Sequence, residues 1–133
     1  MKNVKKLLTE AKKAQKFSHA PYSKAYIGSA LITTKDQIYS GANVENASYG
    51  GTVCAERVAI LKAVSENKNL KIKEVMVINN FDLAWPPCGL CRQVIAEFCT
   101  PTTLVHMSNK KGEVQTLPFK DLFPNAFEKS HLK

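Results

Sequence analysis

Three cysteines in two separated motifs constrain the fold of this chain more than any other feature. Cys54 begins a C-A-E segment, and Cys88 and Cys91 belong to a P-C-G-L-C segment. Each motif opens a stretch with apolar residues at helical spacing, which predicts helices over 54–66 and 88–98. Three thiols at two helix starts form one cluster only if the fold brings those two helix ends together.

Thiolates are soft ligands that suit zinc, and catalytic zinc sites have three protein ligands and one open position. The fourth cysteine, Cys99, lies at the far end of the second helix, roughly 12 Å from Cys91 at the helical rise per residue. We predict that Cys99 is a small buried hydrophobic residue. His106 lies within a strand pattern, where a half-buried structural histidine is expected. We therefore predict one Zn²⁺ per chain, held by Cys54, Cys88 and Cys91.

The residues that follow Cys54 supply the other parts of a hydrolytic site. Glu56 lies two residues after the first ligand, where its carboxylate can take a proton from an attacking water and deliver it to a substrate. Zn²⁺ with three thiolates carries a net charge of −1, which opposes the activation of water. Helix N-termini offset part of this charge, and we predict that Arg57 offsets more of it; a surface salt bridge is the alternative for Arg57. The order C-x-E then P-C-x-x-C resembles the zinc deaminase signature.

Composition predicts a single domain over residues 1–133, because a 44% hydrophobic fraction suits one core. No apolar run approaches the roughly 18 residues that a membrane-spanning helix needs. Lysines interrupt the apolar residues of the N-terminal segment, unlike those of a signal peptide. A cytoplasmic location is therefore expected, and a reducing compartment favours metal binding by the cysteines over disulfides.

The formal net charge of +8 raises the question of a nucleic acid partner. The chain has two arginines, Arg57 and Arg92, and its lysines are scattered over predicted helix faces and turns. A solvated lysine-rich surface is the simpler interpretation of this distribution. We expect neither nucleic acid nor membrane as a partner.

The remaining patterns alternate between strand and helix. Apolar residues at three- and four-residue intervals from Val4 to Phe17 predict a helix that ends before Pro21. We predict strands over 25–34, 37–44, 74–80, 102–108 and 113–118. This order is best accommodated by a three-layer α/β/α domain with a mixed five-stranded sheet.

Three further expectations concern burial. The helix over 54–66 is expected to bury Val58, Ala59, Leu61 and Val64. The helix over 88–98 is expected to bury Leu90, Val94, Ile95 and Phe98. Residues 120–127 predict a short helix or turn with exposed aromatic residues, Phe123 and Phe127. Three C-terminal aromatic residues are expected to favour association: Phe119, Phe123 and Phe127.

Four segments resemble, in order and over almost the whole chain, the small tetrameric cytidine deaminases. They are APYSKAYIGSAL, GANVENASYGGTVCAERVAI, PPCGLCRQVIAEF and DLFPNAF. The resemblance implies a cytidine deaminase-like fold. It also implies zinc-dependent hydrolysis of cytidine and deoxycytidine to uridine and deoxyuridine with release of ammonia, as in pyrimidine salvage. The expected assembly is a homotetramer with shared active sites.

The resemblance also implies roles for individual residues around the three cysteines and the proton shuttle Glu56. Asn43 and Glu45 would hydrogen-bond the ribose, and the backbone around Ala55 would contact the base. Side chains of the Asn and Glu types in a loop independently suit the paired hydroxyls of a ribose. Turn formation is the alternative explanation for such residues, and it fits Asn46 better than Glu45.

Further residues are implied to come from neighbouring subunits. Ala47 and Tyr49 would line the site from one neighbour, and Phe127 would reach across an interface to cover the base. One position departs from the family, because Ala25, followed by Tyr26, stands where a phenylalanine usually packs against the substrate. The absence of a phenylalanine side chain at position 25 leaves the pocket wider or requires another aromatic residue to fill it.

Three alternatives stay open at this point. A deaminase of another aminopyrimidine nucleoside, such as blasticidin S, shares the zinc motifs, although NVEN and CAER favour cytidine. A nucleic-acid editing deaminase would need further basic and aromatic elements for flipped bases, which this chain lacks. A non-enzymatic zinc-binding module would bind zinc without deaminating any nucleoside.

Overall fold

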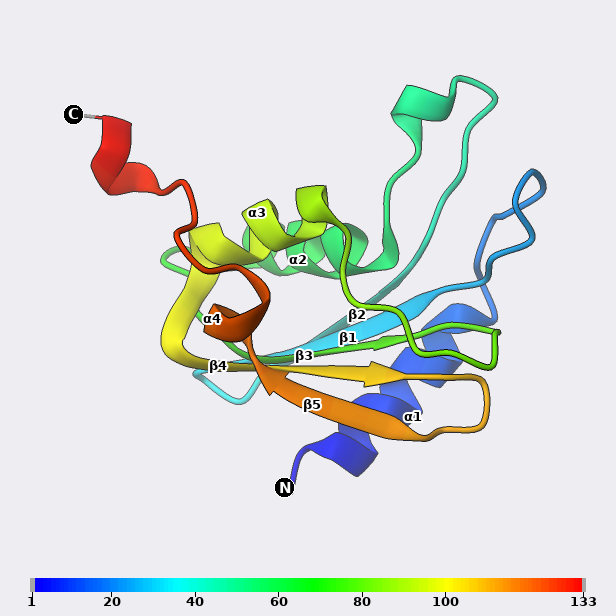
Figure 1. Ribbon diagram of the computed structural model, residues 1–133, viewed down its shortest axis with the longest axis horizontal. Coiled ribbons are helices and arrows are strands. Elements are labelled where there is room, and N and C mark those ends of the chain that lie inside the picture. Colours follow the sequence, from blue (N-terminus) through cyan, green and yellow to red (C-terminus); the bar gives the residue numbers. More distant parts are fainter. Residues whose placement is uncertain (1, 133) are drawn as a thin grey trace.

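A computed structural model describes residues 2–132 and contains one five-stranded sheet with helices on both faces (Figure 1). The strands lie in the order β2-β1-β3-β4-β5. Their bounds are β1 Gly28–Thr33, β2 Ile38–Ala42, β3 Ile72–Ile78, β4 Cys99–Ser108 and β5 Val114–Pro118. The helices are α1 Val4–Gln15, α2 Ala55–Glu66, α3 Gly89–Phe98 and α4 Phe119–Leu122, with short 3₁₀ turns η1 Tyr49–Gly51 and η2 Lys129–Leu132.

The sheet is mixed, as the sequence predicts. β1 pairs antiparallel with β2 and with β3, β3 pairs parallel with β4, and β4 pairs antiparallel with β5. The parallel pair requires a crossover connection, and α3 provides it. This crossover places the start of α3 at the same edge of the molecule as the start of α2, above the sheet in Figure 1.

The core has one layer on each face of the sheet, because successive strand residues point to opposite faces. Leu7 and Ala11 of α1 pack against Ala30 and Met76 on one face. On the other face the core contains Leu31, Ala59, Ile60, Ala63, Val75, Val77, Ile95 and Val105. The three-layer α/β/α architecture is confirmed.

Two glycines let the helices approach the sheet closely. A Cβ atom on Gly41 of β2 would lie 2.7 Å from the backbone nitrogen of Ala59 in α2. A Cβ atom on Gly28 of β1 would lie 2.1 Å from the carbonyl oxygen of Ala11 in α1. Both contacts are impossibly short, so a larger residue at Gly41 would push α2 away from the sheet and displace the cysteine that precedes it.

The expected burial is wrong at several positions. In α2, Ile60 and Ala63 are buried beside Ala59, whereas Leu61 and Val64 are exposed. The physical reason is the close approach at Gly41, which turns the small-residue face of α2 toward the sheet. Leu90 of α3 and Phe17, beyond the end of α1, are also exposed.

The C-terminal aromatic residues do not share one environment. Phe119 is buried in the core, because α4 begins directly after β5 and folds back onto the sheet. Phe123 is half-buried against the same core, and Phe127 is 54% exposed. The expectation of exposure is therefore wrong for Phe123, and the burial of Phe119 removes it from the aromatic residues available for association.

His106 is fully buried, not half-buried as expected. Its two ring nitrogens hydrogen-bond Thr116 Oγ1 and Glu74 Oε1, each at 2.7 Å. Burial opposes the ionisation of Glu74, but hydrogen bonds from Asn3 and His106 outweigh it and lower the pKa of Glu74. A satisfied polar network thus joins α1 to three adjacent strands, which the strand pattern alone does not show.

Within the described residues 2–132, no helix has both the length and the apolar character required to cross a membrane.

Candidate functional site

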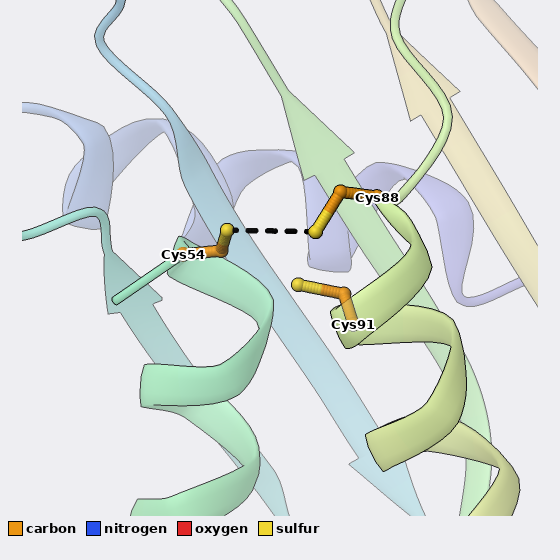
Figure 2. A group of neighbouring side chains, drawn as sticks. All are labelled: Cys54, Cys88 and Cys91. Carbon is orange, nitrogen blue, oxygen red and sulfur yellow. Dashed lines mark hydrogen bonds between the residues drawn. The ribbon is translucent and has the colours of Figure 1, made fainter. Parts of the chain in front are cut away.

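The three predicted zinc ligands meet where α2 and α3 begin (Figure 2). Cys54 directly precedes α2, Cys88 directly precedes α3, and Cys91 lies in the first turn of α3. Their Sγ atoms all lie within 4.8 Å of one another, and Cys54 Sγ is 3.8 Å from Cys88 Sγ. A tetrahedral zinc site with Zn–S distances of about 2.3 Å separates its sulfurs by about 3.8 Å. The cluster therefore has the size and the donor type that zinc requires.

Neither of the other candidate ligands belongs to this cluster. Cys99 lies at the opposite end of α3 and is half-buried, not buried as predicted; its Sγ is 3.5 Å from the carbonyl oxygen of Ala96. Burial raises the pKa of the Cys99 thiol, which disfavours the thiolate that a metal ligand needs. Both ring nitrogens of His106 are engaged with Glu74 and Thr116. Among the described residues 2–132, three thiols form the cluster, so a zinc ion held there would have a fourth position open to a small molecule.

The surroundings of Cys54 favour its ionised form. The neighbouring Cys91 thiol, followed by the Arg57 guanidinium and Cys88, lowers the pKa of Cys54 to about 5 against the opposing effect of burial. The same contact with Cys54, together with burial, raises the pKa of Cys91. Two helix N-termini add their partial positive charge to the cluster.

Arg57 contacts the cluster directly. Its Nη2 atom lies 3.6 Å from Cys54 Sγ and 3.4 Å from the carbonyl oxygen of Thr52. The hydrogen bond to Cys54 raises the pKa of Arg57, so the guanidinium stays charged. These contacts favour the predicted charge compensation over the alternative of a surface salt bridge.

Glu56 occupies the second position of α2 and is buried, with 5% of its surface exposed. Burial raises the pKa of Glu56 to about 7, and the adjacent charge of Cys54 acts in the same direction. A carboxyl group whose pKa is near neutrality can both accept and donate a proton at physiological pH. The environment therefore suits Glu56 to a proton-transfer role.

A cavity of about 220 Å³ opens beside the cysteine cluster. Its walls include most of the residues that the sequence analysis singled out for this site: Cys54, Cys88, Glu56, Asn43, Glu45 and Ala55. Ala25 also lines it. A larger hollow of about 750 Å³ lies between α3, α4 and the C-terminal segment; Cys99 lines it, but Cys54, Cys88 and Cys91 do not.

Asn43 and Glu45 both line the cavity, and both hold its rim in place. Asn43 Oδ1 accepts a hydrogen bond from the Ile27 amide at 3.0 Å, and Asn43 Nδ2 donates to the carbonyl oxygen of Ala25 at 2.8 Å. Glu45 accepts hydrogen bonds from the side chain and backbone amide of Ser23. The Ser23 hydroxyl lowers the pKa of Glu45, so a carboxylate is presented at the rim.

The residues expected from neighbouring subunits do not line the cavity of their own chain. Ala47 and Tyr49 lie in the exposed loop around η1, and Tyr49 is 75% exposed. Phe127 lies in the C-terminal segment, which extends away from the sheet toward η2. In Figure 1 the η1 loop and the C-terminal segment project from opposite sides of the molecule.

Sequence analysis did not single out Trp85, which also lines the cavity. This residue is the only tryptophan in the chain and lies three positions before Cys88. A lone aromatic residue in a loop before a metal motif is a weak signal, because nothing in its spacing shows which way the side chain points.

Comparison with known proteins agrees with this geometry. Residues 1–107 match the family model described as the cytidine and deoxycytidylate deaminase zinc-binding region. A cytidine deaminase of Sporosarcina psychrophila is 42% identical over 98% of this chain and 95% of its own. Another from Halalkalibacterium halodurans is 41% identical over 91% of each chain.

Solved structures show the same likeness. The crystal structure of a cytidine deaminase from Burkholderia pseudomallei superposes with a TM-score of 0.86 at 37% identity, covering 92% of this chain and 98% of its own. The mixed sheet, the paired helix starts and the three-thiol cluster thus occur in a chain that resembles these enzymes over nearly its whole length. This chain belongs to the cytidine and deoxycytidylate deaminase family.

Proposed function

We propose that this chain hydrolyses cytidine and deoxycytidine to uridine and deoxyuridine with release of ammonia. One observation carries this function: a buried carboxyl group with a pKa of about 7 lines the same cavity as Cys54 and Cys88 of the three-thiol cluster. The cavity of about 220 Å³ suits a free nucleoside better than a nucleic acid strand. An assay of ammonia release from cytidine tests the function directly.

The chemistry divides between the metal and Glu56. Cys54, Cys88 and Cys91 would hold zinc, which would act there as a Lewis acid and lower the pKa of a water molecule. Glu56 takes a proton from the water that attacks C4 of the pyrimidine ring and delivers this proton to N3. Glu56 then transfers the remaining proton of that water to the exocyclic amine, which leaves as ammonia. The carbonyl of uridine remains at C4, so atoms and charge balance.

The rim of the cavity positions the nucleoside. Asn43 and Glu45 present an amide and a carboxylate to the paired ribose hydroxyls, and the backbone around Ala55 contacts the base. Their hydrogen bonds to Ala25, Ile27 and Ser23 fix both side chains before the substrate arrives. Such preorganisation reduces the entropic cost of binding.

The active assembly is a homotetramer in which the sites are shared. Tyr49 and Phe127 are exposed aromatic side chains, and neither lines the cavity of its own chain. An exposed aromatic residue on a projecting segment is typical of an interface anchor. Ala47 and Tyr49 from one neighbour, and Phe127 from across an interface, would close each cavity over the base.

Arg57 compensates the negative charge of the thiolates, and this role gives a testable prediction. Arg57→Ala removes the hydrogen-bond donor to Cys54 Sγ. Mutation of a residue that hydrogen-bonds a metal ligand typically lowers metal affinity or activity by about 10- to 100-fold. We expect Arg57→Ala to lose zinc more readily or to turn over cytidine more slowly by about that factor. Arg57→Lys keeps the charge and serves as the control. Unchanged zinc content together with an unchanged rate in Arg57→Ala would refute charge compensation.

Two alternatives make different predictions in the same assay. A deaminase specific for another aminopyrimidine nucleoside would release ammonia from blasticidin S but not from cytidine. A zinc-binding module would bind zinc and release no ammonia from any nucleoside. The buried Glu56 at the cavity favours an enzyme, because a purely structural zinc site has no use for it.

A further inference from the structure

The cavity beside the zinc cluster has one aromatic wall residue among the described positions, and that residue is Trp85. Ala25 lines the same cavity with a single methyl group. Tyr26, the next residue, lines a separate hollow with Gln15 and Asn80. Trp85, not Tyr26, is therefore the aromatic residue that shares this cavity with Ala25.

The indole of Trp85 is held by its own loop. Its ring stacks on Phe81, with ring centroids 4.8 Å apart and an interplanar angle of 16°. Phe81 covers one face of the indole, and Trp85 as a whole remains 42% exposed. Trp85 therefore lines the cavity while it stacks on Phe81.

The loop that carries this pair is tied to the sheet. Buried Asn79 donates to the carbonyl oxygen of Leu83 at 2.8 Å and accepts from the Phe81 amide at 3.0 Å. The Lys110 amide donates to the carbonyl oxygen of Phe81 at 2.9 Å. Asn109 donates to the carbonyl oxygen of Asp82 at 3.0 Å. These hydrogen bonds hold the loop that carries Phe81 and Trp85 in a fixed position on the sheet.

The connection to the metal motif is short and stiff. Two prolines, Pro86 and Pro87, are the only residues between Trp85 and Cys88. Proline fixes the backbone φ angle, so the indole and the Cys88 thiol have little freedom to move relative to each other. A ring packed on Trp85 is thereby held in register with the zinc cluster.

We propose that Trp85 is a substrate-binding residue, forming the aromatic wall on which the pyrimidine ring of the nucleoside packs beside Ala25. This inference rests on the proposed nucleoside deaminase function. Base–aromatic packing is favourable and tolerant of base identity, because every base has a π-face. Trp85 therefore sets the affinity for the ring, while Glu56 and the metal carry the chemistry.

Three variants test the role of Trp85. Trp85→Val removes the aromatic wall and raises KM for cytidine by about 5- to 100-fold, the range that loss of one stacked base contact produces; kcat changes by less than about threefold. Trp85→Phe keeps a ring and retains most of the wild-type affinity. Leu83→Ala is the matched control, because Leu83 lies in the same loop, is 75% exposed and does not line the cavity. Zinc content and thermal unfolding are measured for each variant.

The result that overturns the proposal is a Trp85→Val enzyme whose KM lies within twofold of wild type. Equal increases in KM for Trp85→Val and Trp85→Phe would also overturn it, because a role that does not depend on an aromatic ring would then explain both. A loss of kcat and zinc in Trp85→Val without a change in KM would assign the residue to metal-site support instead.

A measurement on the unaltered protein separates this inference from the proposed function. Trp85 is the only tryptophan, so emission excited at the red edge of indole absorption reports its environment alone. We expect uridine, the reaction product, to change this emission with a saturation curve that matches its inhibition constant. Inhibition by uridine without an emission change would contradict the role of Trp85 and leave the function intact. Absence of turnover, inhibition and emission change together would contradict both.

Discussion

Glu56→Gln lowers kcat for cytidine by about 100- to 10,000-fold, which is the rate enhancement that a positioned general acid–base group usually contributes. The variant protein still binds one zinc ion. The amide is nearly the same size as the carboxyl group, so the buried start of α2 keeps its packing. An amide cannot accept the proton of the attacking water at neutral pH, nor pass that proton to N3 and to the leaving amine. Both proton transfers are therefore lost in the same substitution.

Glu66→Gln is the control for this substitution. It makes the same chemical change in α2, at an exposed position at the end of the helix. Initial rates and the zinc content of each protein are measured by ammonia release and atomic emission. Turnover of Glu56→Gln within tenfold of wild type would rule out Glu56 as the proton shuttle, whatever the zinc content.

Cys91→Ala abolishes zinc binding and deamination together. Cys91 is fully buried, and its sulfur is one of three in the cluster. Removing one of three protein ligands leaves two sulfurs at the ends of two different helices. We expect a greater loss of zinc affinity than the roughly 10- to 100-fold that removal of an outer partner costs. Zinc that binds only the folded protein also stabilises it, so the variant unfolds at a lower temperature.

The fourth cysteine provides the matched control for the cluster. Cys99→Ala makes the same substitution in the same helix, at a half-buried position outside the cluster. We expect it to keep zinc and most of the activity. Stoichiometric zinc in Cys91→Ala, or zinc loss equal in both variants, would show that the metal is held elsewhere.

The positions of the zinc ligands could be predicted because they depend on local chemistry. Cys54 and Cys88 precede apolar patterns at helical spacing, so their places at helix starts follow from the local sequence, whereas the approach of the two helix starts depends on the fold. The hairpin of β1 and β2 is predictable for a similar reason, since its turn and both strands are adjacent in sequence. The mixed sheet followed from the alternation of strand and helix patterns.

Features that depend on distant packing could not be predicted. The buried face of α2 is decided by Gly41 of β2, which no periodicity within α2 shows. Phe119 is buried because α4 folds back onto the core, whereas its local sequence is typical of a surface turn. The partners of His106 come from two other strands, so the strand pattern indicated only a half-buried residue.

The same distinction applies to the cavity. Asn43 and Glu45 were identifiable by residue type, but their hydrogen bonds to the segment that contains Ser23 and Ala25 depend on the folded loop. Trp85 lines the cavity only because a loop anchored to Asn79 and Asn109 brings it there. Side-chain direction in an irregular loop leaves no periodic signal in the sequence.

The measurement that tests the central claim most directly is the reaction of zinc-loaded wild-type protein with cytidine, followed by ultraviolet absorbance and ammonia release in the same sample. We predict that cytidine absorbance falls while ammonia appears in equal amount, and that removal of zinc by a chelator stops both. Full zinc occupancy with neither an absorbance change nor ammonia from cytidine or deoxycytidine would contradict the assignment as a cytidine deaminase.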